Sequence, residues 1–190
     1  MEYHNEFAKS YIESLQNMHN SISLVCFSKK HPGCVLLAQR SPEAKSYPKF
    51  WSLPSKRVMP QVRWRTTQFG DTITSIHPFA DIEDAIIDIL LSLGIGAKQI
   101  RNVADEEPYA VWNEKGEQDR GDHRTRMSNI PVMIQDGDVT IKDPGKYTAL
   151  AWVPFEEARE LLRPAAEQGS LCSENFQKSL SRFLPSEQQA

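Results

Sequence analysis

The chain has 190 residues, of which 39% are hydrophobic and 25% are charged, and its formal net charge is -3. This balance is typical of one globular domain, excludes a disordered or fibrous chain, and disfavours a general nucleic-acid-binding protein, which is normally basic. The three cysteines, Cys26, Cys34 and Cys172, have no CxxC spacing, so neither a disulfide framework nor a zinc site is expected.

The N-terminal segment is predicted to be an amphipathic helix. Across residues 2–18, apolar side chains recur at steps of three and four residues, namely Tyr3, Phe7, Tyr11, Leu15 and Met18. We expect residues 1–20 to form a helix that packs on the domain, with a partner-binding helix as the alternative. The segment lacks the apolar core of a signal peptide, and no stretch is long and apolar enough to span a membrane. We therefore expect a cytoplasmic location and no membrane association.

Two strands and a long loop are predicted next. Ser21–Phe27 and Cys34–Arg40 are rich in β-branched and apolar residues, and the intervening residues 29–33 contain a Pro-Gly pair. This pattern favours a hairpin. Residues 41 to about 78 contain prolines at positions 42, 48, 54 and 60, which disfavour long regular elements. We therefore expect this segment to be looped.

The second half of the chain combines helices and strands. Asp81–Leu93 is the clearest helix, because Asp81 is a good N-cap, acids occupy the first turn and Gly94 follows the last turn. Strands are expected at Tyr109–Asn113, Asn129–Gln135 and Ala149–Val153, and helices at Phe155–Leu162 and residues 173–184. This order predicts an α/β fold of the α+β type, with helices packed on a sheet.

Short motifs in a characteristic order resemble the Nudix superfamily. Members often read vLL.qR, then W.LPGG, and then a loop and helix called the Nudix box; here VLLAQR stands at 35–40 and FWSLP at 50–54. AWVP at 151–154, followed by FEEA, resembles the end of the same domain. The similarity covers about residues 21–162. It implies an α/β/α sandwich with a mixed sheet, to which N-terminal and C-terminal helices are added.

The resemblance also suggests how the chain is divided. The stretch between Trp51 and the predicted helix is longer than is usual in the family, so residues 57–78 are interpreted as an insertion. We expect a Nudix-like domain at residues 21–163, preceded by the N-terminal helix and followed by a C-terminal helix and tail at residues 164–190.

The Nudix box is degenerate in this chain. Its pattern is G-x5-E-x7-R-E-U-x-E-E-x-G-U, where U is aliphatic, and its closing glycine aligns with Gly94. The pattern's Glu, Arg, Glu, Glu and Glu then fall, in that order, on Phe79, Ile87, Asp88, Leu91 and Ser92. Only Asp88 keeps an acid. Ser55 and Lys56 also stand where the family has Gly-Gly.

The missing acids bear directly on the expected chemistry. Magnesium takes oxygen ligands, and positions 88, 91 and 92 lie on one face of a helix, where carboxylates can hold the ion against a diphosphate and activate water. Asp88 alone can hold a weakly bound ion at most. Glu106 and Glu107 are candidate replacement ligands, with a solvated acidic turn as the alternative. Magnesium is thus a doubtful cofactor, Asp88 is the one candidate catalytic residue, and standard pyrophosphate hydrolysis is expected to be impaired or lost.

The residues that replace the acids are partly apolar. Ile87 and Leu91 form an apolar pair on the side of the helix that would face substrate, in addition to a core stripe formed by Ile82, Ile86, Ile89 and Leu93. A helix that is apolar on two sides is usually covered on two sides. We therefore expect the insertion or a second subunit of a homodimer to bury Ile87 and Leu91.

Basic and aromatic residues suggest an anionic small-molecule ligand. Lys56 and Arg57 occupy the loop that approaches the diphosphate in Nudix proteins, and Arg124 and Arg126 belong to a second basic cluster. Such side chains bind phosphate oxygens without a metal, although solvated loop charges are the alternative. Trp51 is a candidate to stack on a base, and packing in the core is its alternative.

Three functions remain open on the sequence alone. The first is a Nudix-type enzyme that acts on a diphosphate-linked, nucleotide-type compound through Asp88 and ligands from elsewhere. The second is a non-catalytic binding or regulatory module that keeps the pocket for such an anion. The third is a different reaction on the same fold, and fold analogy does not choose among the three.

Overall fold

The computed structural model describes residues 18–58, 61–67, 70–77, 82–103, 109–113 and 124–170, together with Ser173 and Phe176. Residues 1–17 of the predicted N-terminal helix and most of the predicted C-terminal helix lie outside these residues, as do Cys172, Glu106 and Glu107. Residues 18–20, which we expected to end the N-terminal helix, are not helical and belong to the strand Met18–Ser28. Within the described part of the chain, no helix is long and apolar enough to cross a membrane.

The larger sheet is mixed and is built around the strand β1. β1 (Met18–Ser28) pairs in parallel with β9 (Arg124–Ile134) and antiparallel with β4 (Ser55–Val58). On its far side β9 pairs antiparallel with β7 (Ile100–Val103) and with β8 (Tyr109–Asn113). The predicted strand at Tyr109–Asn113 is thus confirmed, and the predicted strand at Asn129–Gln135 is the second half of β9.

The smaller sheet is antiparallel and has β2 at its centre. β2 (Cys34–Arg40) pairs with β10 (Tyr147–Pro154) on one side and with β3 (Trp51–Ser52) on the other. The predicted hairpin of the first two strands is wrong, because β1 and β2 belong to different sheets. The middle of each strand is fully buried, at Leu24 and Val25 in β1 and at Leu36 and Leu37 in β2. Each strand therefore gains more from the partners of its own layer than from pairing with its neighbour in sequence.

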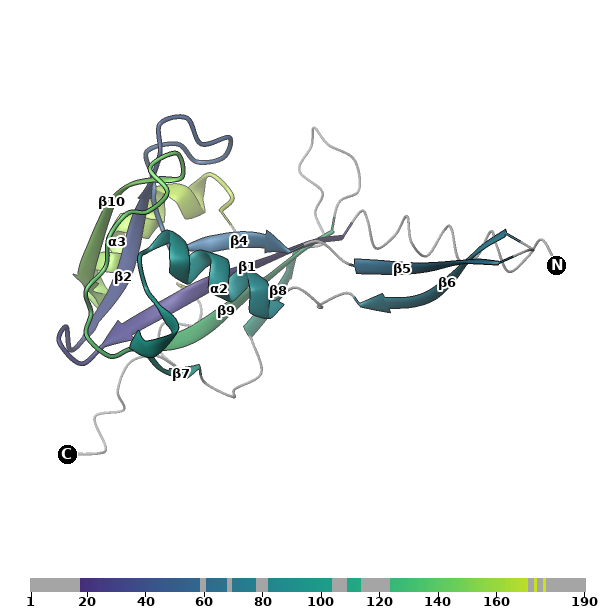
Figure 1. Cartoon of the computed structure of the whole chain (residues 1–190). Coiled ribbons are helices and arrows are strands. Elements are labelled where there is room, and N and C mark those ends of the chain that lie inside the picture. The colour runs from purple at the N-terminus through teal and green to yellow at the C-terminus, as the bar shows by residue number, and fades with distance from the viewer. Residues whose placement is uncertain are drawn as a thin grey trace.

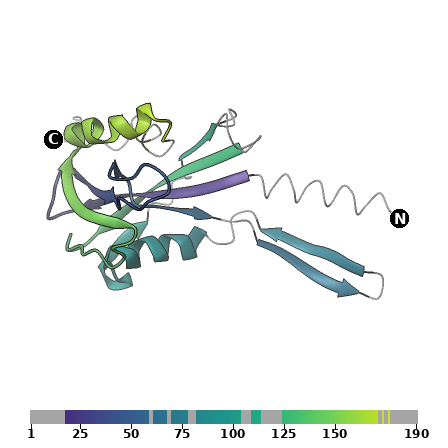
Figure 2. The ribbon, with the colours of Figure 1, turned by 90° about the horizontal axis from the view of Figure 1, so that it is seen from above.

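Two helices complete an α/β/α sandwich with a mixed sheet, as predicted. Figure 2 shows α2 (Ile82–Ser92) and α3 (Phe155–Glu167) on opposite sides of the strands. α2 packs over β1 and β4, and α3 packs over β2, β3 and β10. Each helix covers its own hydrophobic cluster: Ile89 and Leu93 lie in the α2 cluster, and Leu162 lies in the α3 cluster. Phe176 is also fully buried in the α3 cluster.

The segment expected to be looped contains four strands. Besides β3 and β4, β5 (Gln61–Thr67) and β6 (Gly70–His77) pair as an antiparallel hairpin, which extends away from the sandwich (Figure 1). The prolines in this segment do not prevent strands, because Pro54 stands between β3 and β4 and none lies inside an element. Most of the predicted insertion at residues 57–78 is therefore this hairpin.

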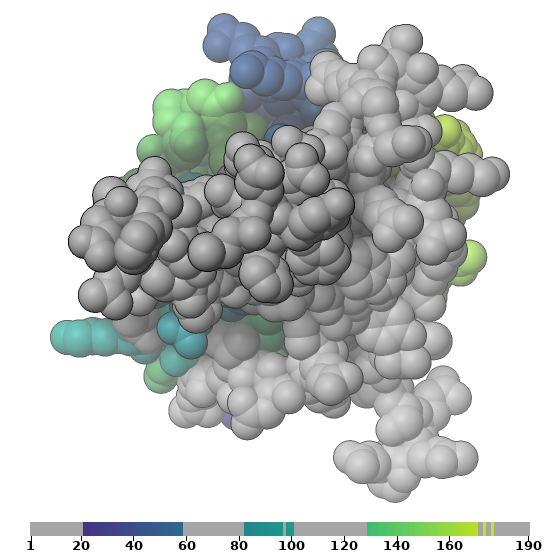
Figure 3. All heavy atoms as spheres, turned by 90° about the vertical axis from the view of Figure 1, so that its right-hand side faces the viewer, coloured from purple at the N-terminus to yellow at the C-terminus, as the bar shows by residue number. Residues whose placement is uncertain are grey.

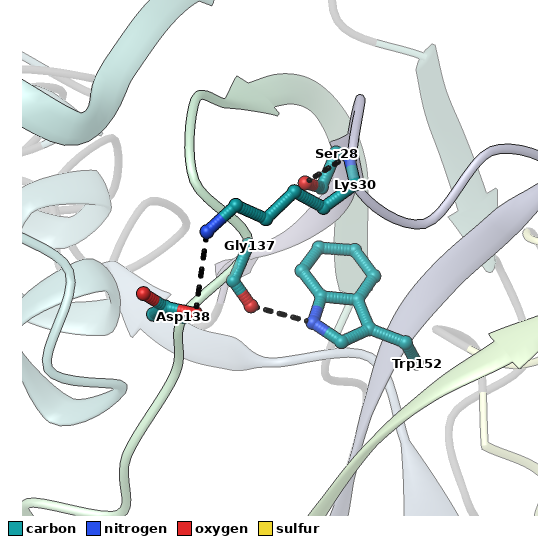
Figure 4. Close-up of polar contacts among 5 residues, drawn as sticks. All are labelled: Ser28, Lys30, Gly137, Asp138 and Trp152. Carbon is teal, nitrogen blue, oxygen red and sulfur yellow. Dashed lines mark hydrogen bonds and ion pairs between the residues drawn. The ribbon is translucent and has the colours of Figure 1, made fainter.

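A cluster of contacts fixes the turn between β1 and β2 to the loop after β9 (Figure 4). The indole Nε1 of Trp152 donates a hydrogen bond of 2.8 Å to the carbonyl oxygen of Gly137, and the His31 ring stacks on Trp152 with centroids 5.0 Å apart. Lys30 and Asp138 form an ion pair of 3.8 Å. Gly137 has a φ of 71°, a conformation that favours glycine. These contacts join the ends of the two sheets.

Candidate functional site

The candidate site lies on the outer side of α2. The apolar stripe predicted for this helix faces the sheet, with Ala85, Ile89 and Leu90 buried, whereas Ile87 and Leu91 are 52% and 55% exposed. Our expectation that the insertion buries Ile87 and Leu91 is wrong, because the β5–β6 hairpin extends away from the body of the molecule and does not fold over α2. The expectation of a covering second subunit stays a prediction.

Asp88 forms an ion pair with Lys56, and this contact is the centre of the site. The Nζ of Lys56 lies against Oδ2 of Asp88, and both side chains are about half exposed. Lys56 is held there by β4, which is fixed by its register with β1 and by the buried Val58 that packs in the same core as α2. The candidate catalytic acid Asp88 is therefore neutralised by Lys56, which directly precedes Arg57 in β4.

The described residues around Asp88 do not fit a magnesium ion. Leu91 offers no ligand atom, and the Ser92 hydroxyl donates a hydrogen bond of 2.6 Å to the carbonyl oxygen of Ile89. Among the residues that the structure describes, no group of three His, Cys, Asp or Glu side chains is placed to hold a metal. A cation at Asp88 would also have to displace the ammonium of Lys56. The atoms around Asp88 thus form an ion pair and do not offer the several oxygen ligands that magnesium requires.

The other predicted site residues are placed at different distances from this centre. Arg57 is exposed and follows Lys56 in β4, so it lies on the opposite face of that strand. Trp51 packs against the α3 cluster, away from α2. Arg124 and Arg126 stand in β9, in register with Met18 and Asn20 of β1. Of the predicted ligand-binding residues whose side chains the structure describes, Lys56 is the one that contacts Asp88.

Two basic residues that sequence reasoning did not assign to the site lie close to it. Burial lowers the pKa of Lys146, with Arg40 and Lys56 contributing in the same direction and the carboxylates of Asp143 and Asp88 opposing it. The charges of Arg40, Lys56, Asp143 and Asp88 thus all act on Lys146. In the sequence, Lys146 is marked by a Pro-Gly pair directly before a strand. Such a pair predicts a turn and indicates no particular chemistry.

Hydrogen bonds fix the backbone on which these residues stand. The backbone N–H of Ser41 donates to the carbonyl oxygen of Lys146 (3.0 Å), and the N–H of Ser55 donates to the buried Tyr147 hydroxyl (3.2 Å). The loop after β2 and the loop before β10 accordingly lie side by side at the surface, as the blue and light green atoms at the upper edge of Figure 3 show. The site therefore joins β2, β4, β10 and α2.

Comparison with known proteins identifies the fold. The structure resembles a C. elegans Ap4A hydrolase in a binary complex, with a TM-score of 0.53 at 17% sequence identity over 87% of this chain and 99% of that chain. It also resembles the E. coli dihydroneopterin triphosphate pyrophosphohydrolase (0.53, 16%, 86% and 93%) and the Nudix domain of Shewanella oneidensis NrtR complexed with ADP ribose (0.53, 13%, 88% and 89%). No protein-family model and no curated protein sequence matches the chain.

At these sequence identities the likeness shows the fold, and it confirms the fold that the sequence motifs implied. The chain has a Nudix fold.

Proposed function

We propose that the protein binds a diphosphate-containing, nucleotide-type small molecule beside α2, and that standard magnesium-dependent hydrolysis of such compounds is impaired or lost. The observation that carries this proposal is the Lys56–Asp88 ion pair. It places an ammonium group where a diphosphate hydrolase of this fold needs a metal bound to several carboxylates, and an ammonium group binds phosphate oxygens directly.

The similar structures support the ligand class. Two of those proteins are named for Ap4A and dihydroneopterin triphosphate, and the third is complexed with ADP ribose. All three compounds carry linked phosphates. The ligand class is therefore the same, but basic side chains replace the metal ion in neutralising the charge of the ligand's phosphates. Lys56 makes the first contact in this proposal, and Arg124 and Arg126 of β9 are further candidates. Trp51 and Arg57 lie away from Asp88, so a ligand beside α2 reaches them only if it extends beyond Lys56.

A Nudix-type enzyme that uses Asp88 remains the second candidate. Its metal would need ligands from outside the described residues, and Glu106 and Glu107 are the candidates that the sequence offers. In this case Asp88 would bind the metal, and its substitution would abolish turnover.

A hydrolysis assay separates the two functions. The chain is incubated with a panel of nucleoside diphosphate derivatives and magnesium or manganese, and release of phosphate or nucleotide is followed. We expect turnover far below the common enzyme value of about 10 per second, and little change in Asp88→Ala. Asp84→Ala is the matched control, because it removes an exposed aspartate from the same helix. Turnover near the common value that Asp88→Ala abolishes and Asp84→Ala preserves would establish the enzyme.

A further inference from the structure

Lys146 is a cation without a neutralising contact. It is half-buried at the start of β10, and its Nζ lies 5.0 Å from the centre of the Tyr147 ring. Within the described ranges the ion pairs are Lys30–Asp138, Lys56–Asp88 and Arg163–Glu160, so Lys146 takes part in none of them. Partial burial of an ammonium group without a paired carboxylate is unfavourable, and a bound anion would offset that cost.

Arg40 is the second basic residue here with unused hydrogen-bonding capacity. Its Nε is buried and has no hydrogen-bond partner among the described residues. Its backbone is fixed on both sides, since its N–H donates to the carbonyl oxygen of Phe50 (2.9 Å) and its carbonyl oxygen accepts from Lys49 (3.2 Å). Arg40 pairs with Tyr147 across β2 and β10, which places it beside Lys146. A buried guanidinium donor is normally satisfied, so an oxygen acceptor is expected here.

Arg40 and Lys146 belong to a cluster of three basic residues, the third of which is Lys56. Asp88 is the counter-ion of Lys56 within this cluster. Arg40 and Lys56 belong to β2 and β4, and Lys146 directly precedes β10. The backbone of each is held by strand pairing or, for Lys146, by the hydrogen bond from Ser41. Asp88 neutralises Lys56, and the exposed Asp143 is the other carboxylate that acts on Lys146. Three cations and two carboxylates leave a net positive charge on this surface of a chain whose total charge is -3.

We infer that Arg40, Lys56 and Lys146 form a phosphate-binding site that needs no divalent cation, in which a phosphate oxygen of the ligand replaces Asp88 as the partner of Lys56. The inference rests on the proposed function, and it adds the residues and the mode of binding. Lys56 exchanges one oxyanion for another, so no proton moves at that residue. Lys146 and Arg40 gain the acceptor that they lack in the free protein.

The test uses inorganic pyrophosphate as the probe, with isothermal titration calorimetry in the presence of EDTA. Lys146→Met is expected to weaken binding about tenfold or more, which is the usual effect of losing one charge-assisted contact. Lys142→Met is the matched control, because it removes an exposed lysine of the same loop that does not act on Lys146. Asp88→Asn is expected to strengthen binding, by up to about fivefold, because it removes the competing carboxylate.

A second measurement keeps the inference testable if Lys146→Met folds poorly. Lys146→Arg preserves the charge and should preserve binding at neutral pH. The affinity of the natural protein should fall as the pH rises through the lowered pKa of Lys146, whereas that of Lys146→Arg should not, because arginine stays charged. The other charged groups that act on Lys146 are Arg40, Lys56, Asp88 and Asp143, and both proteins have all four, so the comparison isolates residue 146.

The outcomes separate this inference from the proposed function. Equal losses in Lys146→Met and Lys142→Met, pyrophosphate binding that requires magnesium, or weaker binding by Asp88→Asn would each overturn the inference. If nucleoside diphosphate derivatives bind and pyrophosphate does not, the site is wrong while the proposed function stands. If neither binds, with or without magnesium, both are wrong.

Discussion

Alanine at Gly137 should destabilise the protein more than alanine at Gly33. The two glycines have nearly the same backbone conformation, with φ of 71° and 72°, so the strain of placing an alanine there is common to both and amounts to about 1–2 kcal/mol. Their surroundings differ. An added Cβ at Gly137 would lie 2.6 Å from Oγ of Ser28 and 2.9 Å from Cδ2 of His31, whereas at Gly33 nothing lies within 4 Å.

The neighbours of Gly137 are held in place, and this decides how large the loss of stability in Gly137→Ala is. The His31 ring is stacked on Trp152, and Trp152 is itself bonded to the carbonyl oxygen of Gly137. Moving the His31 ring therefore disturbs its stack on Trp152, and moving Trp152 strains its hydrogen bond to Gly137, which Figure 4 shows. Overpacking of this kind costs about 1–3 kcal/mol. We expect a loss of about 1–2 kcal/mol for Gly33→Ala and about 2–5 kcal/mol for Gly137→Ala.

Urea unfolding followed by tryptophan fluorescence measures both losses. The slopes with denaturant should be equal, so that the shift in midpoint reports stability alone. In thermal unfolding the difference should appear as a further drop of about 2–4 °C per kcal/mol for a chain of this size. Equal losses in the two variants would refute the reasoning, because they would show that the contacts at Gly137 yield without cost.

Three further predictions follow from burial and charge. Leu91→Glu should change the free energy of unfolding by about 1 kcal/mol or less, because the side chain is already 55% exposed; a larger loss, or a fall in solution mass measured by light scattering, would show that a partner subunit covers this face. Asp88→Ala should lower the free energy of unfolding by no more than about 1 kcal/mol in urea titrations, because the Lys56–Asp88 pair is half exposed and screened by solvent; a loss of several kcal/mol would contradict this. Burial raises the pKa of the Cys26 thiol to about 12, so iodoacetamide should alkylate the partly exposed Cys34 first, as peptide mass spectrometry would show. Because the thiol's pKa is higher in the folded chain than in the unfolded one, its contribution to stability is lost as the pH rises from the unfolded pKa toward 12.

The strands that were predicted best are those that their own residues indicate, without reference to distant parts of the sequence. Cys34–Arg40 and Tyr109–Asn113 have the bounds that β-branched and aromatic residues indicated. Which strands pair with each other, in contrast, is decided by residues that are far apart in the sequence. β1 and β9 pair across positions as far apart in sequence as Ser23 and Asn129, and no short-range pattern specifies such a pairing. The predicted hairpin failed for this reason, since the Pro-Gly turn fixed where β1 ended but not which strand lay beside it.

The missed elements had weaker signals. Between β5 and β6 the sequence reads Gln68-Phe69 and has no Asn-Gly or Asp-Gly pair, which is the pair that marks tight hairpins. β7 has only four residues, Ile100–Val103, and lies directly after a single helical turn at Ala97–Gln99. Prolines were interpreted as signs of a loop, although Pro54 stands between two short strands, β3 and β4.

The candidate site was predicted in part. Asp88 and Lys56 were each singled out through the family resemblance, but their contact joins residues 32 positions apart and depends on how β4 and α2 pack. Lys146 and Arg40 acquire their importance only through tertiary structure, because burial and the neighbouring charges distinguish them from other basic residues. The exposure of Ile87 and Leu91 likewise depends on the direction of a hairpin that helical periodicity does not encode.

The dependence of ligand binding on magnesium tests the central claim most directly. The affinity for a nucleoside diphosphate derivative such as ADP ribose is measured by calorimetry in EDTA and again with millimolar magnesium. Because Lys56 already neutralises Asp88 and the described residues around it do not fit a magnesium ion, we predict the same affinity in both conditions and no release of product during the titration. Binding that appears only with magnesium, together with turnover near about 10 per second, would contradict the account.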